Sequence, residues 1–222
     1  MIWPTLTIDK FFVNPNSVIE YSKSLKFLPG KGTWPGTRTI STHQFDPNFF
    51  QKTTEKIIAA LYPNDVNKDS CLEWQATQYF QKIKPSEYPE KGFIHQDLSH
   101  EFTSVVYLSD EDNNGTCIYQ LKDPVKNNFY KETQKENYLN PNKKRTKEFK
   151  KAIKENHNSY EKVLELKAKK NRMILFDGSQ YHGVDNYGND NKERLTLVTF
   201  FEFVKRVDNQ PLKFHASECI RY

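Results

Sequence analysis

The sequence lacks most of the short motifs by which whole classes of protein are recognised. Only three cysteines occur in 222 residues, and no two have the spacing Cys-x-x-Cys, so neither a disulfide framework nor a zinc knuckle is indicated. There is no Gly-x-Gly-x-x-Gly and no Gly-x-x-x-x-Gly-Lys sequence, and glycine itself occurs only eight times. A dinucleotide-binding fold and a phosphate-binding loop therefore have no support.

Long apolar runs are also missing. No stretch approaches the roughly 18 to 20 continuous apolar residues that a membrane-spanning helix requires. The first residues, Met1 to Leu6, do not combine a basic flank with an apolar run, as a secretory signal would. These absences predict a cytoplasmic protein with no membrane partner.

What the chain does contain is enough apolar material for one substantial core. Hydrophobic residues make up 36% of the sequence and aromatic residues 14%, which predicts a single domain spanning residues 1–222. The net charge of +5 is unevenly placed, because residues 122–154 carry eleven basic and four acidic side chains. Residues 121–161, rich in Lys and Asn, are predicted to form a surface insertion with short helices such as Thr146–Asn156. Contact with nucleic acid stays open, but without interleaved aromatics a solvated insertion is favoured.

The order of the predicted elements favours an α+β fold. Asn14-Pro15 and Asp46-Pro47 each place a capping side chain before proline, which predicts two helices within a helical support at residues 1–70. Residues 72–120 and 162–205 then form a β core of short antiparallel strands, as a sandwich or barrel. Asn114-Gly115 predicts a hairpin turn within that core. The predicted strands are Leu72–Phe80, Phe102–Leu108, Thr116–Gln120, Val163–Ala168, Arg172–Phe176 and Leu195–Val204.

Three side chains in the β core suggest a metal site. In extended backbone, His95 and Asp97 point to the same face, because residues i and i+2 do so. His182 follows the apolar strand that ends at Gly178, which places a second imidazole at a strand end. Two His and one Asp form the ligand set that suits non-haem Fe(II) and leaves coordination positions open.

Arg194 is the fourth candidate residue. It shares one strand face with Thr196 and Val198, and if that face lines a barrel, an unpaired guanidinium there costs several kcal/mol. The carboxylate of a small molecule would satisfy it bidentately. Pairing with a protein acid, Asp177 or Glu202, is the structural alternative.

His95-x-Asp97, His182 and Arg194 twelve positions later resemble the Fe(II)/2-oxoglutarate-dependent oxygenases of the double-stranded β-helix (jelly-roll or cupin-like) fold. The resemblance spans about residues 74–203. Within that superfamily the chain is most similar to the prolyl-4-hydroxylase-like branch and to uncharacterised bacterial and phage members. The strand at 75–80 before Gly92-Phe93-Ile94-His95, and the run at 104–109, carry this likeness.

The resemblance implies a hydroxylase that uses Fe(II), 2-oxoglutarate and O2 and releases succinate and CO2. His95, Asp97 and His182 would be the catalytic metal ligands, and Arg194 would bind the far carboxylate of 2-oxoglutarate. Thr196, Tyr107 and Tyr79 are candidates to hydrogen-bond the same molecule; a plain core role is the alternative for each. Arg38 and Trp34, in a loop with Pro35-Gly36, are candidate substrate-binding residues, or else stabilise a turn.

The substrate is not indicated by any motif. Prolyl hydroxylases usually carry Lys where Arg194 stands, and nucleic-acid demethylases of the AlkB type carry a second Arg where this chain has Phe200. Prolyl specificity therefore does not follow, and a nucleobase is disfavoured. On the family resemblance alone, an amino-acid or peptidyl side chain is preferred to another small metabolite. Two other hypotheses remain, a non-catalytic β-barrel binding protein and a nucleic-acid-binding module built on the basic insertion. The sequence does not indicate an oligomeric state.

Overall fold

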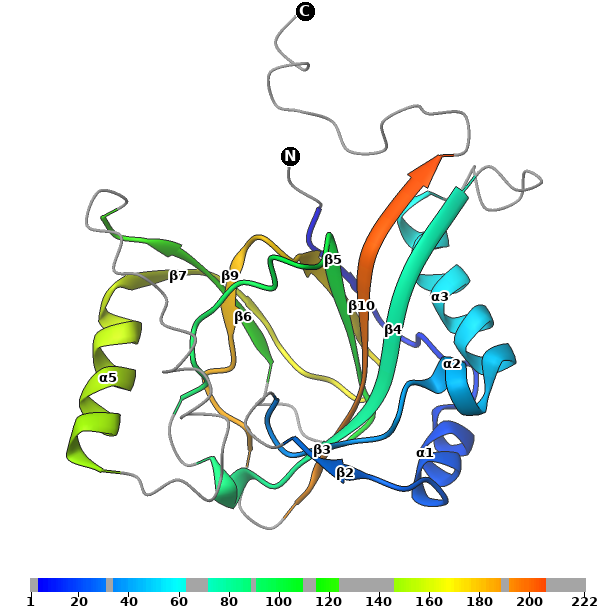
Figure 1. Ribbon diagram of the computed structural model, residues 1–222, viewed down its shortest axis with the longest axis horizontal. Helices are drawn as coiled ribbons and strands as arrows, with labels where there is room; N and C mark the ends of the chain where they lie inside the picture. Colours follow the sequence, from blue (N-terminus) through cyan, green and yellow to red (C-terminus); the bar gives the residue numbers. More distant parts are fainter. Residues whose placement is uncertain are drawn as a thin grey trace, which may run out of the picture.

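The computed structural model describes residues 4–30, 34–62, 72–88, 91–109, 115–123, 146–188 and 192–206. Their strands are β1 (Leu6–Ile8), β2 (Leu28–Pro29), β3 (Thr37–Arg38), β4 (Leu72–Ile83), β5 (Phe102–Tyr107), β6 (Thr116–Leu121), β7 (Tyr160–Leu166), β8 (Met173–Asp177), β9 (Tyr181–Gly183) and β10 (Arg194–Arg206). They form a seven-stranded sheet, in the order β1-β8-β5-β10-β4-β3-β2, and a three-stranded sheet, β7-β6-β9. Every pair among these strands is antiparallel, and the two sheets face each other (Figure 1). The predicted α+β class is confirmed.

Three N-terminal helices cover the outer face of the larger sheet: α1 (Pro15–Lys23), α2 (Thr42–Phe45) and α3 (Pro47–Leu61) (Figure 1). The Asn14 side chain accepts a hydrogen bond from the Ser17 amide, and Asp46 accepts one from the Phe49 amide, so α1 and α3 begin as predicted. A short 3-10 helix, Pro85–Glu87, follows β4. The main core between helices and sheet includes Ile57, Ile58, Phe80, Phe102, Leu197 and Phe201.

Strand alternation divides β10 between two layers. Leu195 and Leu197 pack in the main core on the helical side, whereas Val198 packs in a second cluster between the two sheets. Arg194 and Thr196 share the side of Val198 and therefore face the space between the sheets.

Two expectations about the chain's organisation are wrong. The strands on either side of Asn114-Gly115 do not form a hairpin, because β5 pairs with β8 and β10 while β6 pairs with β7 and β9. The connection thus crosses from one sheet to the other. The N-terminal region is not only helical, since β1, β2 and β3 all belong to the larger sheet. These strands have two or three residues each, too few for an alternating pattern to mark them.

The basic insertion joins β6 to β7, two adjacent strands of the smaller sheet. Its predicted helix is α5 (Lys147–Asn158), which begins after the Thr146 cap. Residues 124–145 of the insertion lie outside the described residues. Among the described helices, none has the length and apolar character needed to cross a membrane.

Candidate metal centre

The structure brings His95, Asp97 and His182 together between the two sheets. Nε2 of His95 lies 3.6 Å from Oδ1 of Asp97, and Nε2 of His182 lies 3.4 Å from Oδ2 of the same carboxylate. One ligand atom from each residue lies within 4.8 Å of those from the other two. Residues 87 positions apart in the chain therefore present their donor atoms to one point.

Backbone pairing fixes this arrangement. His95 and His182 form an isolated antiparallel bridge, with N–O distances of 3.0 and 2.8 Å. The Asp97 amide donates to the carbonyl of Gly178 at 2.7 Å. A Cβ at Gly178 would lie 2.2 Å from the carbonyl oxygen of His100, so only glycine fits at this crossing. The glycine that ends β8 thus allows the two ligand-bearing segments to approach.

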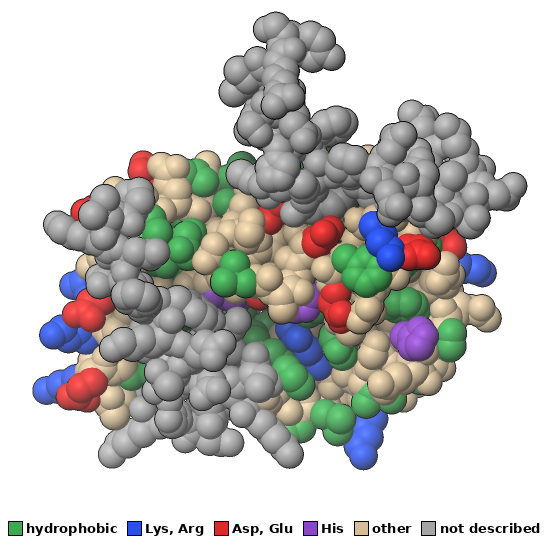
Figure 2. All heavy atoms as spheres, turned by 45° about the horizontal axis from the view of Figure 1, so that its top comes forward, with side chains coloured by type: hydrophobic (Ala, Val, Ile, Leu, Met, Phe, Trp, Pro, Cys, Tyr) green, Lys and Arg blue, Asp and Glu red, His purple; other side chains and the backbone are tan. Residues whose placement is uncertain are grey.

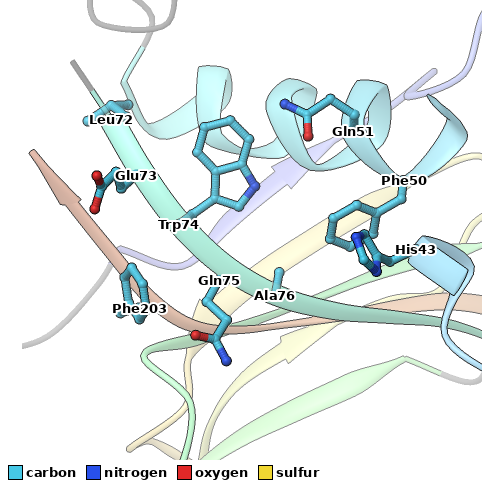
Figure 3. A pocket seen from close by; sticks show the side chains of 9 residues that line it. All are labelled: His43, Phe50, Gln51, Leu72, Glu73, Trp74, Gln75, Ala76 and Phe203. Carbon is cyan, nitrogen blue, oxygen red and sulfur yellow. The ribbon is translucent and has the colours of Figure 1, made fainter. Parts of the chain in front are cut away.

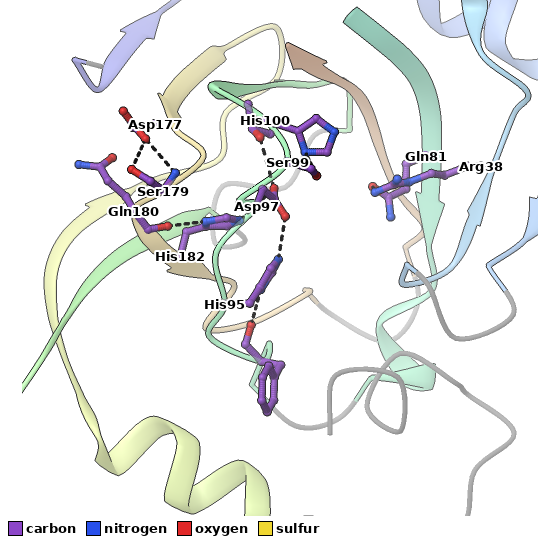
Figure 4. A network of polar contacts seen from close by, with 12 residues as sticks. Arg38, Gln81, His95, Asp97, Ser99, His100, Asp177, Ser179, Gln180 and His182 are labelled. Carbon is purple, nitrogen blue, oxygen red and sulfur yellow. Dashed lines mark hydrogen bonds and ion pairs between the residues drawn. The ribbon is translucent and has the colours of Figure 1, made fainter. Parts of the chain in front are cut away.

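Hydrogen bonds also orient both imidazoles (Figure 4). Nδ1 of His95 lies 2.8 Å from the carbonyl oxygen of Phe93, and Nδ1 of His182 lies 2.9 Å from that of Gln180. A carbonyl accepts only, so each Nδ1 is the donor, and Nε2, which faces Asp97, is the ring atom left for a metal ion. Such carbonyl partners are typical of metal-binding histidines. The two nitrogens and one carboxylate fit the ligand set of non-haem Fe(II).

A cavity of about 130 Å³ surrounds these ligands. Figure 2 shows histidine side chains in a hollow of the surface, next to a basic side chain. Of the described residues that line the cavity, only Asp97, Arg38 and Arg194 carry a full charge when the histidines are neutral. Most of the others are apolar or aromatic, including Ile83, Phe93, Val105, Phe176, Tyr187, Val198 and Phe200. The cavity therefore combines one acidic and two basic groups in an apolar setting.

Arg194 is 5% exposed and lies between two tyrosine rings. Its guanidinium carbon is 5.3 Å from the ring centre of Tyr107 and 5.7 Å from that of Tyr187. Nε is buried without a hydrogen-bond partner among the described residues. Asp177 accepts hydrogen bonds from Ser179, and no described ion pair links it to Arg194. Pairing with the Asp177 carboxylate therefore does not account for the burial of the Arg194 guanidinium.

The other predicted cofactor-binding residues lie around Arg194 but differ in access to the cavity. Thr196 is buried and lines it. The Tyr107 hydroxyl lies 3.0 Å from the Thr116 hydroxyl, and burial raises the pKa of this phenol. Tyr79 is not among the lining residues; its ring centre is 5.6 Å from the Arg38 guanidinium. Tyr107 thus contacts Arg194 and Tyr79 contacts Arg38, and neither tyrosine lines the cavity itself.

The predicted substrate residues lie together at the β3 edge. Arg38, in β3, lines the cavity, and its guanidinium stacks on the Trp34 ring at 5.2 Å. The Trp34 indole does not line the cavity, because its Nε1 packs near Gly30. In Figure 4, Arg38 and Gln81 lie across the site from His182.

Sequence reasoning missed the contribution of α5 to this site. The Asn156 side chain accepts from the Ile94 amide at 2.9 Å and donates to the Ile94 carbonyl at 3.1 Å. His157 Nε2 lies 2.8 Å from the Gly92 carbonyl, and burial lowers the pKa of this imidazole. The helix thereby holds the segment that leads into His95. No local signal marks these residues, because their partners lie more than 60 positions away.

Other candidate sites are less suited to chemistry. A larger groove of about 630 Å³ lies between β4 and the helical layer, but His43 and Glu73 are its only titratable lining residues (Figure 3). Cys117, Glu165 and Asp185 also cluster, but Lys162 Nζ lies 2.8 Å from both carboxylates and already supplies the cation. Among the described residues, His43, His100 and His157 take no part in the His95–Asp97–His182 cluster.

Comparison with known proteins identifies the fold and the family. HygX from Streptomyces hygroscopicus, solved with nickel and 2-oxoglutarate bound, is 15% identical with a TM-score of 0.55, over 89% of this chain and 82% of that one. SnoK, a non-heme alpha ketoglutarate dependent carbocyclase from nogalamycin biosynthesis, is 7% identical with a TM-score of 0.53, over 89% and 78% of the two chains. EvdO2 from Micromonospora carbonacea var. aurantiaca, complexed with 2-oxoglutarate, is 10% identical with a TM-score of 0.50, over 94% and 90%.

These likenesses show a shared fold. No curated protein matches the sequence. The model of the family of unknown function DUF6445 matches residues 3–201, and the chain belongs to this family.

Proposed function

We propose that the chain is an Fe(II)- and 2-oxoglutarate-dependent dioxygenase with a double-stranded β-helix core, which hydroxylates a small organic substrate. The proposal depends chiefly on the convergence of two imidazole Nε2 atoms and one carboxylate within a cavity that also contains a buried arginine. Support comes from the fold neighbours HygX and EvdO2, whose structures hold 2-oxoglutarate, and from SnoK, which depends on it.

The metal ligands, Arg194 and its neighbours each have a role in this proposal. His95, Asp97 and His182 would hold Fe(II), which together with 2-oxoglutarate and O2 would supply the oxidising chemistry, with succinate and CO2 as products. Arg194 binds the far carboxylate of 2-oxoglutarate, and Thr196 lies one inward step along the same strand. Tyr107 orients Arg194 through its ring, and the apolar lining excludes water from the reacting atoms.

The acceptor in this proposal is an amino-acid side chain, free or peptidyl, as in the prolyl-4-hydroxylase-like branch. The small cavity, of about 130 Å³, supports a small acceptor group over a stacked nucleobase. We do not propose nucleic-acid binding or a non-catalytic β-barrel binding protein, because a binding role alone would not require the complete set of metal ligands beside a buried guanidinium.

An anaerobic titration of the purified full chain with Fe(II) and 2-oxoglutarate tests this function. We expect a visible metal-to-ligand charge-transfer band in the wild type, none in Asp97→Ala, and an unchanged band in His100→Ala. His100 is a matched control because it lies three residues from Asp97 and outside the ligand cluster. A folded wild type without the band, or a band that persists in Asp97→Ala, would refute the proposal.

A further inference from the structure

Arg38 is held in a cage of aromatic rings at the edge of the cavity. Its guanidinium carbon lies 5.2 Å from the ring centres of Trp34 and Phe200 and 5.6 Å from that of Tyr79. Rings at these distances attract a cation and restrict its movement. The cage joins residues of β3, β4 and β10 to the loop before β3, so it forms only in the folded chain.

One nitrogen of the Arg38 guanidinium has a hydrogen-bond partner, and another, Nε, has none among the described residues. Nη2 donates to Oε1 of Gln81 at 3.4 Å, and the Gln81 amide nitrogen in turn donates to the Pro35 carbonyl at 2.7 Å. Nε of Arg38 is buried and has no hydrogen-bond partner in the described parts of the chain. A buried N–H in this state destabilises the free protein unless a ligand accepts from it.

The charge of Arg38 is also not fully balanced. Burial lowers the pKa of the guanidinium from 12.5 to about 10, and the negative charge of Asp97 opposes this shift, so the group stays charged at neutral pH. In the proposed complex, a divalent ion, Arg194 and Arg38 face the carboxylate of Asp97 and the two carboxylates of 2-oxoglutarate. One positive charge then lacks a counter-charge. Since Arg194 is matched by 2-oxoglutarate, that charge belongs to Arg38.

We infer that Arg38 binds the carboxylate of the substrate, so that the acceptor is a small carboxylic acid without a compensating positive charge, held by its acid group in the aromatic cage. This inference rests on the proposed function. A carboxylate matches the two parallel N–H bonds on one edge of a guanidinium. It also brings the single negative charge that the cavity lacks, whereas a phosphate monoester would bring nearly two. Trp34, Tyr79 and Gln81 are positioning residues in this account, because they hold Arg38.

Arginine side-chain NMR of the full chain, with Zn(II) as the diamagnetic metal and 2-oxoglutarate added, tests the inference. The Arg38→Gln variant assigns the Arg38 Nε–H signal. Acetate, butyrate and benzoate are then titrated against acetamide, butyramide and benzamide, which have nearly the same shapes without the charge. We expect a saturable downfield shift of the Arg38 Nε–H with each acid and none with the amides.

Arg38→Gln should still bind Zn(II) and 2-oxoglutarate, while its affinity for the acids falls at least about tenfold. Arg172→Gln serves as the matched control, because Arg172 binds Asp9 at the surface and lies outside the cavity, so acid binding should not change. Equal responses to acids and amides would overturn the inference, as would an Arg38 signal that responds to 2-oxoglutarate and not to the acids. Failure of the proposed function looks different, because then Arg194 would not respond to Zn(II) and 2-oxoglutarate.

Discussion

Arg194 shows how a single residue can indicate a missing partner. Removing a guanidinium from water costs several kcal/mol, and two tyrosine rings offset only part of that cost. A protein would be more stable with a carboxylate beside Nε, but the described residues place none there. Under the proposed function, an anionic ligand supplies the acceptor that this buried Nε lacks.

Replacement of Arg194 by Gln should weaken 2-oxoglutarate binding about 10- to 100-fold, because a charge-assisted hydrogen bond of about 1.5–3 kcal/mol is lost. Binding of Fe(II) alone should be unchanged, since Arg194 is not a metal ligand. Calorimetric titrations of the metal, and then of 2-oxoglutarate, separate the two effects. Arg172→Gln is again the control. An unchanged dissociation constant for 2-oxoglutarate would show that Arg194 does not bind its carboxylate.

The site residues that could be predicted from the sequence are those marked by the spacing of residues close together in the chain. His95 and Asp97 share a face through strand alternation, and Arg194 is inward-facing for the same reason. The cage around Arg38 could not be predicted in this way. Trp34 lies near it in sequence, but Tyr79 and Phe200 are brought to it by the pairing of β4 with both β3 and β10.

At the scale of elements, α5 links the basic insertion to the site. Asn156 satisfies both backbone groups of Ile94, a fully buried residue one position before His95. The sequence predicted this helix correctly from its cap and placed it on a solvated surface insertion. The sequence pattern could not show that a polar side chain of this helix, Asn156, hydrogen-bonds the backbone of a residue 62 positions away.

Replacement of Asn156 by Ala should displace His95 and weaken Fe(II) binding about tenfold, as loss of supporting contacts to a metal ligand commonly does. It should also lower the free energy of unfolding by about 1–3 kcal/mol, because a buried N–H and C=O lose their partner. The charge-transfer band should move in energy, which a purely structural loss would not cause. Asn158→Ala, on an exposed position of the same helix, is the control. An unshifted band with wild-type affinity would rule out a positioning role for Asn156.

Hairpin prediction failed at Asn114-Gly115 because the signal is local and the pairing is not. β5 is buried along its whole length and lies between β8 and β10 in the larger sheet, so β6 has no free edge to join there. The burial of β5 therefore determines which strands pair with it, and the sequence of the following turn does not determine this pairing.

At the scale of the whole molecule, the smaller sheet is tied together by one charged network. Asp185, three residues after His182, accepts hydrogen bonds from the Tyr119 hydroxyl at 2.6 Å and from Lys162 at 2.8 Å. These partners lie on β6 and β7, so the network joins both strands to the segment that follows β9. It links the stability of the smaller sheet to the position of a proposed metal ligand.

This network makes the free energy of unfolding depend on pH within a defined acidic range. Burial acts to raise the pKa of Asp185, but the bonds from Lys162 and Tyr119 outweigh it and lower the pKa from 3.8 to about 2. A carboxyl group whose pKa is lower in the folded state stabilises the fold above its unfolded pKa, and this stability is lost as the pH falls from about 4 to 2.

Asp185→Asn should therefore cost about 1–2 kcal/mol of unfolding free energy at pH 7, after allowance for solvent screening, and much less near pH 2. Urea unfolding at pH 7, 4 and 2.5 measures this difference. Glu165→Gln is the matched control, because Glu165 contacts the same lysine from an exposed position and its loss should cost less than about 0.5 kcal/mol. If the wild type and Asp185→Asn lost stability in parallel between pH 4 and 2.5, the network would not be the source of the acid sensitivity. A larger loss in the wild type would show that protonation of Asp185 releases the segment next to His182.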